Sequence, residues 1–186
     1  MAKYRLGFGM TGFSARYGVD RFHHARVKYK SLLNKFGIFA FYYKIGKYMK
    51  SSVNVEWQKN MHFVSLVNGI SINLDADEAS GGENIGPRPK PLLLATLGGC
   101  TGMDIVSILK KMQVEIEFFN VKVESESLDE HPKRYTSMHL IYEVKAKNLT
   151  VEKLEKAINL SMEKYCSVKA TLAPAVTITS EYKILE

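Results

Sequence analysis

Apolar and polar residues alternate along six segments between residues 53 and 186, which is the pattern of half-buried β-strands. These segments lie near residues 53–57, 64–66, 70–74, 114–123, 138–146 and 176–184. Asn68-Gly69 stands between the second and third segments, and this pair favours the type I′ turn, in which two successive residues have positive φ. The pattern therefore predicts a β-hairpin there. The alternation changes phase after Phe118, which predicts a β-bulge near Phe119 and Asn120.

Two further segments have helical spacing. Pro91 suits the first turn of a helix, where its missing N–H costs nothing, and the helix is expected to run through Leu92–Met112. Its first half is apolar on most sides, so we expect burial on most sides, with a second chain as part of the cover. Thr150 is the predicted N-cap of a second helix, which Pro174 ends. The order β-β-β-α-β-β-α-β indicates an α+β fold.

Charge divides the chain near Met49. Residues 1–50 contain eleven Lys and Arg, one acid and 12 of the 20 aromatic residues, whereas residues 51–186 contain 15 basic and 18 acidic residues. The net charge of +7 therefore belongs to the first part, and the body gives no reason to expect a nucleic-acid partner. We interpret 1–48 as a basic, aromatic-rich N-terminal extension and 49–186 as the domain.

Three origins of residues 1–48 remain open on the sequence. The segment could be an upstream extension outside the fold, with Met49 as the natural start. It could instead be a targeting or membrane-surface segment, or an arm that regulates the protein or contacts nucleic acid. Its longest apolar run, 37–43, is far shorter than the roughly 20 residues that cross a membrane, so no transmembrane segment is expected there.

The chain has only two cysteines, Cys100 and Cys166, which fits a cytoplasmic protein with thiols that are either inert or redox-active. Gly98 and Gly99 directly precede Cys100, although each glycine inside a helix costs about 1 kcal/mol relative to alanine. Either they allow a partner helix or a substrate to approach closely, or they break the helix so that Cys100 begins a new one. No metal is expected, because the cysteines are 66 positions apart and no Cys/His pair has ligand spacing.

Two longer motifs carry a family resemblance. "GPRPKPLLLATLGGCTGMDIVSILKKM" and "EKYCSVKATLAPAVTITSEY" resemble the OsmC/Ohr family of osmotically inducible and organic-hydroperoxide-resistance proteins, over roughly residues 50–185. The resemblance implies antiparallel sheets packed around two long central helices in an intertwined homodimer. It also implies a thiol peroxidase with Cys100 as the peroxidatic and Cys166 as the resolving cysteine, no cofactor, and an external dithiol as reductant.

The chain departs from the family where the thiol is activated. Active members carry a glutamate ten residues before the reactive cysteine, and this chain has Lys90 there. They also use an arginine from the N-terminal hairpin region, and residues 51–87 contain none. Two functions therefore remain: a peroxidase that reduces organic hydroperoxides in oxidative-stress defence, or a non-catalytic dimer that binds a small hydrophobic ligand. We expect Asp104 to pair with a polar group or to cap locally, because an unpaired buried carboxylate is costly.

Overall fold

The structure, a computed structural model, describes residues 49–186. The basic N-terminal extension predicted for 1–48 lies outside the described residues, so its boundary with the domain stays a prediction. The described part contains two three-stranded sheets, in the orders β1-β2-β3 and β4-β5-β6. The strands are β1 (Asn54–Lys59), β2 (His62–Val67), β3 (Ile70–Leu74), β4 (Glu115–Ser127), β5 (Tyr135–Lys147) and β6 (Thr177–Ile184).

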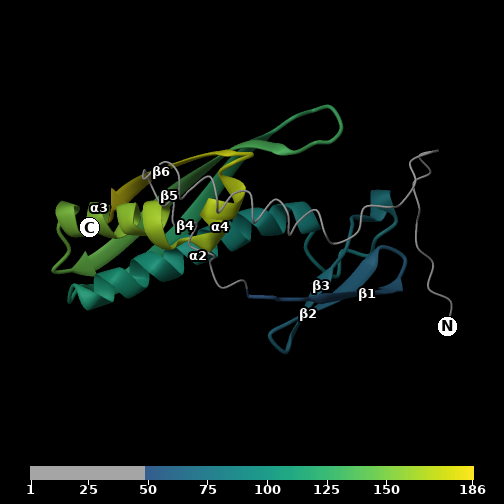
Figure 1. Ribbon diagram of the computed structural model, residues 1–186, viewed down its shortest axis with the longest axis horizontal. Coiled ribbons are helices and arrows are strands. Elements are labelled where there is room, and N and C mark those ends of the chain that lie inside the picture. Colours follow the sequence, from purple (N-terminus) through teal and green to yellow (C-terminus); the bar gives the residue numbers. More distant parts are fainter. Residues whose placement is uncertain (1–48) are drawn as a thin grey trace, which may run out of the picture. The chain divides into compact units, whose positions relative to one another are not determined.

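The helical elements follow the predicted order, which confirms the α+β class. They are η1 (Glu78–Ser80), α2 (Pro89–Lys111), α3 (Val151–Leu160), η2 (Ser161–Tyr165) and α4 (Ser167–Leu172). In Figure 1, α2 is the long teal helix, and α3 and α4 lie beside it. Leu97, Ile105 and Leu109 of α2 are fully buried in the core. They pack with the inward residues of β5 and with α3, so α2 is the central helix of this fold.

The predicted hairpin is confirmed in its detail. Asn68 and Gly69 have φ of 52° and 81°, as a type I′ turn requires, and they join β2 to β3. A bulge is present in β4, but it lies between Ile116 and Phe118, two to three residues earlier than predicted. The helix α2 begins at Pro89 rather than at Pro91, with no side-chain cap at Arg88.

Two expectations about the architecture are wrong. The second sheet is not wholly antiparallel, because β5 and β6 pair in parallel. The segment from α3 to α4 connects the end of β5 to the start of β6. Parallel strands require a crossover connection of this kind, usually a helical one. The second helix is not continuous either. Thr150 caps it as predicted, its hydroxyl accepting the Lys153 N–H, but the helix widens into the π-turn η2 and breaks at Cys166.

The helix α2 is long and apolar enough to cross a membrane, by length and composition alone. The face with Gly98 and Gly102 packs on β4, and α3 and α4 also pack against this helix. Within the single chain 33% of this apolar stretch is buried, so packing inside the chain accounts for part of its composition, and cover by a second chain stays a prediction.

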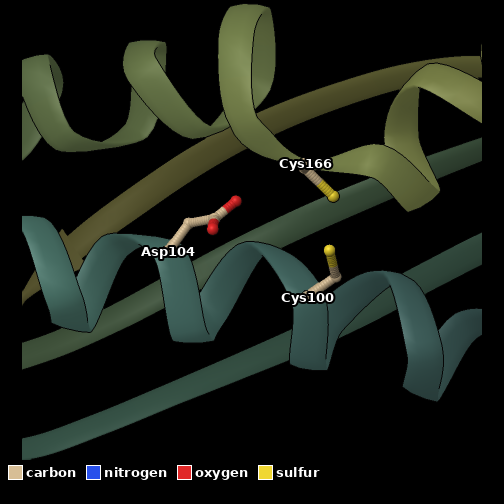
Figure 2. A group of neighbouring side chains, drawn as sticks. All are labelled: Cys100, Asp104 and Cys166. Atoms are coloured by element: carbon tan, nitrogen blue, oxygen red, sulfur yellow. The ribbon is translucent and has the colours of Figure 1, made fainter. Parts of the chain in front are cut away.

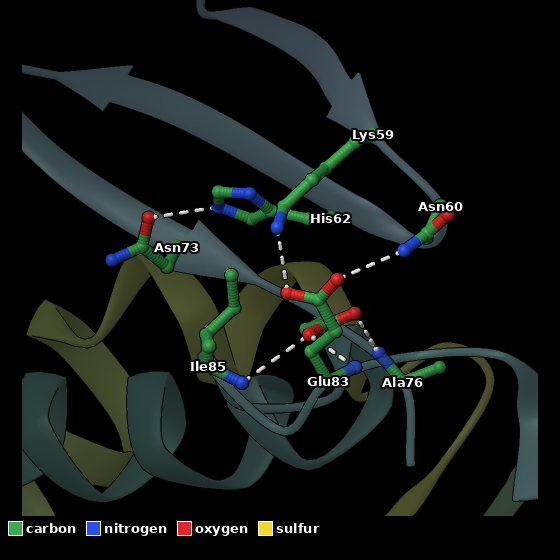
Figure 3. Close-up of polar contacts among 8 residues, drawn as sticks. Lys59, Asn60, His62, Asn73, Ala76, Glu83 and Ile85 are labelled. Atoms are coloured by element: carbon green, nitrogen blue, oxygen red, sulfur yellow. Dashed lines mark hydrogen bonds and ion pairs between the residues drawn. The ribbon is translucent and has the colours of Figure 1, made fainter. Parts of the chain in front are cut away.

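A buried carboxylate organises the loop between β3 and α2. Asp75 accepts hydrogen bonds from the backbone N–H groups of Ala76, Glu83 and Ile85, at 2.8, 3.0 and 3.2 Å. Glu83 in turn binds Lys59 and Asn60 at the β1–β2 turn, each at 2.9 Å (Figure 3). The loop that leads into α2 is thus held to the first sheet by two carboxylates.

We predict that Asp75→Asn lowers the melting temperature at neutral pH by several degrees. Burial raises the pKa of Asp75, but the N–H groups of Glu83, Ala76 and Ile85 outweigh it, so the folded-state pKa lies below the ordinary value of 3.8. A lowered pKa stabilises the fold above pH 3.8, and this stability is lost as the pH falls through the folded-state value. Thermal denaturation between pH 7 and 3 measures this effect.

Asp129→Asn is the matched control, because Asp129 is fully solvated and its ion-pair partner among residues 49–186 is Lys133 at the surface. We expect its stability to follow the wild type across the pH range. Equal behaviour of the two variants would contradict the assigned role of Asp75.

Candidate functional site

Cys100 lies in the middle of α2, which is unbroken from Pro89 to Lys111. The alternative in which the glycines break the helix is therefore wrong. Helix-dipole effects are confined to the first turn, so Cys100, eleven residues beyond the start, gains little from the dipole. Its side chain is partly buried and packs against the core.

The glycines beside Cys100 have different roles. A Cβ on Gly98 would lie 3.0 Å from Val123, and one on Gly102 would lie 3.3 Å from Val121, so both allow α2 to approach β4 of its own chain. A Cβ on Gly99 would meet no atom of another element within 4 Å, and this residue lines an open groove. Gly98 and Gly99 both line this groove, so the prediction that they let a substrate or a partner approach stays a prediction.

The groove has a volume of about 560 Å³ and lies between α2 and β4. Its lining is mainly apolar and consists of Leu94, Ala95, Gly98, Gly99, Gly102, Met103, Val106, Phe119, Asn120, Val121 and Val123. Neither cysteine lines it, so the groove is a separate feature from the thiols.

The different surroundings of Gly98 and Gly99 predict different effects of alanine substitution on the free energy of unfolding. Gly99→Ala should stabilise the chain by about 1 kcal/mol, the difference in helix propensity. Gly98→Ala should be less stable than Gly99→Ala by at least about 1 kcal/mol, because its methyl group presses on Val123. Urea denaturation of both variants gives the comparison. Equal stabilities would contradict the packing of Gly98 on β4.

Cys166 lies at the break between η2 and α4. Its backbone is extended, with φ −68° and ψ 101°, and its Sγ accepts the Lys169 N–H at 3.3 Å. The thiol is only 4% exposed. Single π-turns of this kind commonly accompany functional sites, since they displace one side chain from the regular helical face.

The fold brings Cys100 and Cys166 together. Figure 2 shows the two sulfur atoms pointing toward each other, with the carboxylate of Asp104 one turn further along α2. The two Sγ atoms and a carboxylate oxygen of Asp104 all lie within 4.8 Å of one another. Both thiols are free. A disulfide would require the two sulfur atoms, which are at most 4.8 Å apart, to close to about 2.05 Å.

Asp104 is held by Ser161, whose hydroxyl donates to Oδ2 at 3.0 Å. The expectation that Asp104 pairs with a polar group is confirmed. Ser161 itself was not singled out in the sequence, where its helical spacing from Leu154 and Ile158 places it on the apolar face; the structure shows that it is fully buried. Buried hydroxyl groups need a hydrogen-bond partner, and here the partner is the carboxylate.

Burial raises the pKa of the Cys166 thiol to about 11, with a contribution from Cys100, while the Lys169 N–H acts in the opposite direction. The buried thiol is therefore protonated at neutral pH. Because the thiolate is the attacking species, Cys166 is poorly suited to be the first nucleophile. The partly buried Cys100 is the better placed of the two for that role.

Lys90 and the two arginines of residues 49–186 make their side-chain contacts away from the two thiols. Lys90 binds the Ser127 hydroxyl at 2.8 Å and lies 4.3 Å from the centre of the Tyr135 ring. Arg88 contacts Asn84 and Asp77, and Arg134 binds the Ala175 carbonyl. These are the two arginines of residues 49–186, so the described part of the chain presents no arginine to the thiols.

A second cleft, of about 460 Å³, opens beside Asp104. Its lining combines polar and apolar side chains: Asp104, Ser107, Ile108, Lys111, Met112, Leu160 and Tyr165. The cleft gives solvent and small molecules a path to the carboxylate end of the cluster.

Comparisons with known proteins agree with this fold. The family model described as OsmC-like protein matches residues 81–181. Protein YhfA of Escherichia coli K12 is 34% identical over 132 residues, which cover 70% of this chain and 96% of that protein.

Two solved structures illustrate the likeness. A hypothetical protein from Aquifex aeolicus is 30% identical, with a TM-score of 0.63, and the match covers 75% of this chain and all of that one. An organic hydroperoxide resistance protein, OsmC, from Legionella pneumophila is 14% identical with a TM-score of 0.53, over 74% and 99% of the two chains; at that identity it shows the fold alone. The family model spans more than half of the residues and a relative matches over nearly its whole length, and so the chain belongs to the OsmC-like protein family.

Proposed function

We propose that this protein is a cysteine-based peroxidase that reduces organic hydroperoxides. The observation that carries the proposal is the approach of Cys100 and Cys166, from separate helices, to within 4.8 Å. One thiol is partly buried and the other is buried, which matches the division between an attacking and a resolving cysteine. Family membership supports the reaction type, because other members are named as hydroperoxide resistance proteins.

The proposed peroxidase reaction has three steps. The Cys100 thiolate attacks the O–O bond of the hydroperoxide, gives Cys100 sulfenic acid and releases the alcohol after protonation. The Cys166 sulfur then attacks the sulfenic sulfur, forms the disulfide and releases water. An external dithiol reduces the disulfide and is itself oxidised, which restores both thiols in a reducing compartment such as the cytoplasm.

The first experiment is a peroxide-consumption assay with the reduced protein and a dithiol. Cumene and tert-butyl hydroperoxide should both be consumed over many turnovers. Protein alkylated at its thiols beforehand is the control and should be inactive. Absence of turnover with both hydroperoxides would remove the peroxidase proposal.

A second candidate function is ligand binding without turnover. It is favoured by the apolar groove between α2 and β4 and by the engagement of Lys90, Arg88 and Arg134 away from the thiols. The pH dependence of Cys100 alkylation separates the two functions. Reaction well below the free-thiol value of about 8.5 supports catalysis, and reaction only above it supports binding.

We also propose that the working unit is a homodimer. Pairing in the first sheet places a set of apolar side chains on one face: Val55, Trp57, Phe63, Val67, Ile70, Ile72 and Leu74. Trp57 is 59% exposed and Ile70 is 67% exposed within the single chain. A three-stranded sheet needs a covered apolar face to be stable, so a second copy is the expected cover.

A further inference from the structure

The cluster of Cys100, Cys166 and Asp104 combines three groups that become anionic on deprotonation. Asp104 forms no ion pair with a lysine, arginine or histidine among residues 49–186, and its hydrogen-bond partner there is Ser161. Carboxylates and thiolates that are removed from water are stabilised by a nearby positive charge. The described part of the chain supplies no such charge from a side chain that contacts Asp104.

The spacing of the three groups fits a metal ion. Zinc–sulfur bonds of about 2.3 Å and zinc–oxygen bonds of about 2.0 Å, in a tetrahedron, separate the ligand atoms by about 3.3–3.8 Å. The three ligand atoms here lie within 4.8 Å of one another, so small side-chain rotations would close the site. Two sulfur ligands and one oxygen ligand leave a fourth position for water.

The surroundings also suit a bound cation. Ser161 donates to Oδ2 of Asp104 and thereby fixes the carboxylate, as groups outside the ligand set commonly do in metal sites. The cleft beside Asp104 provides a path from solvent to the cluster. In the sequence, the 66 positions between the cysteines gave no reason to expect zinc. In the fold, α2 packs against η2 and α4, so the two cysteines are close in space.

We infer that the reduced protein binds one thiophilic divalent cation, such as Zn²⁺, through Cys100, Cys166 and Asp104. Disulfide formation consumes both sulfur ligands, so the oxidised protein does not bind the cation. The site would therefore hold a metal only while its thiols are reduced. This inference does not rest on the peroxidase proposal, because metal binding involves no peroxide.

Titration of the reduced, untagged full-length chain with Cd²⁺ tests the inference. We expect a thiolate-to-metal charge-transfer band that saturates at one Cd²⁺ per chain and disappears when Zn²⁺ competes. The band requires a metal–sulfur bond, so metal bound by histidines elsewhere does not contribute to it. Protein oxidised to the disulfide with diamide should show no band, a comparison that requires no variant.

Variants identify the ligands. Cys100→Ser and Cys166→Ser should each lower the affinity by at least about 100-fold, and Asp104→Asn and Ser161→Ala by at least about 10-fold. Glu130→Gln, which changes an exposed carboxylate in the β4–β5 turn, should bind as the wild type does. The inference is overturned by absence of the band in the reduced wild type, by a band that survives either cysteine change, or by equal affinity of Asp104→Asn and Glu130→Gln.

Discussion

Cys100→Ser protein will leave cumene hydroperoxide unconsumed, whereas Cys166→Ser protein will consume one equivalent and then stop. The first variant has lost the attacking sulfur, and we expect its rate of peroxide consumption to fall by more than about 1,000-fold. The second keeps that sulfur but has no thiol within reach to resolve the sulfenic acid. The buried position of Cys166 explains why it cannot replace Cys100 as the nucleophile.

The two variants act as controls for each other. Without reductant, a dimedone-type probe should label Cys100 in Cys166→Ser protein and should label neither cysteine in the wild type, because the wild type proceeds to the disulfide. Circular dichroism should show both variants folded. Peroxide consumption by Cys100→Ser at the wild-type rate would contradict the assignment of the two roles.

The second large effect concerns the exposed apolar face of the first sheet. Trp57→Asp should weaken the dimer by at least about 100-fold, because large aromatic side chains dominate interface energetics and a charge there would be buried without a partner. In the single chain Trp57 is 59% exposed, and within one protomer the substitution removes an exposed hydrogen bond from its Nε1–H to the Asn60 carbonyl at 2.9 Å.

Leu66→Asp is the matched control, because Leu66 lies on the opposite face of the same sheet and is 52% exposed. Sedimentation velocity of wild type and both variants at micromolar concentration provides the measurement. We expect the wild type and Leu66→Asp to be dimers and Trp57→Asp to be monomeric or unfolded. A monomeric, folded wild type would contradict the proposed dimer.

Much of the fold was predictable because the signals are local. The Asn68-Gly69 turn, the cap at Thr150 and the alternation in β5 each depend on a few neighbouring residues, and all three are present. The break at Cys166 was not predictable from spacing, because residues 151–165 keep one helical period. The break follows η2, where the hydrogen bond from the Cys166 N–H to the Ser161 carbonyl spans five residues instead of four, and the residue types in 161–165 give no signal for it.

The site was predictable in part. The family motifs singled out both cysteines, but composition and spacing say nothing about how close two helices bring them. Asp104 was recognised as costly to bury, while its partner Ser161 comes from a segment 57 residues away and could be assigned only in three dimensions. The same holds for Gly98, whose neighbour Val123 lies on β4.

The central claim is that Cys100 and Cys166 form one redox pair. Its most direct test is intact and peptide mass spectrometry of the reduced wild type after one equivalent of cumene hydroperoxide, without a reductant. We predict the loss of two hydrogen atoms and of both titratable thiols, with one crosslink between the peptides that contain Cys100 and Cys166 in a single chain. Two free thiols after excess hydroperoxide would contradict the claim.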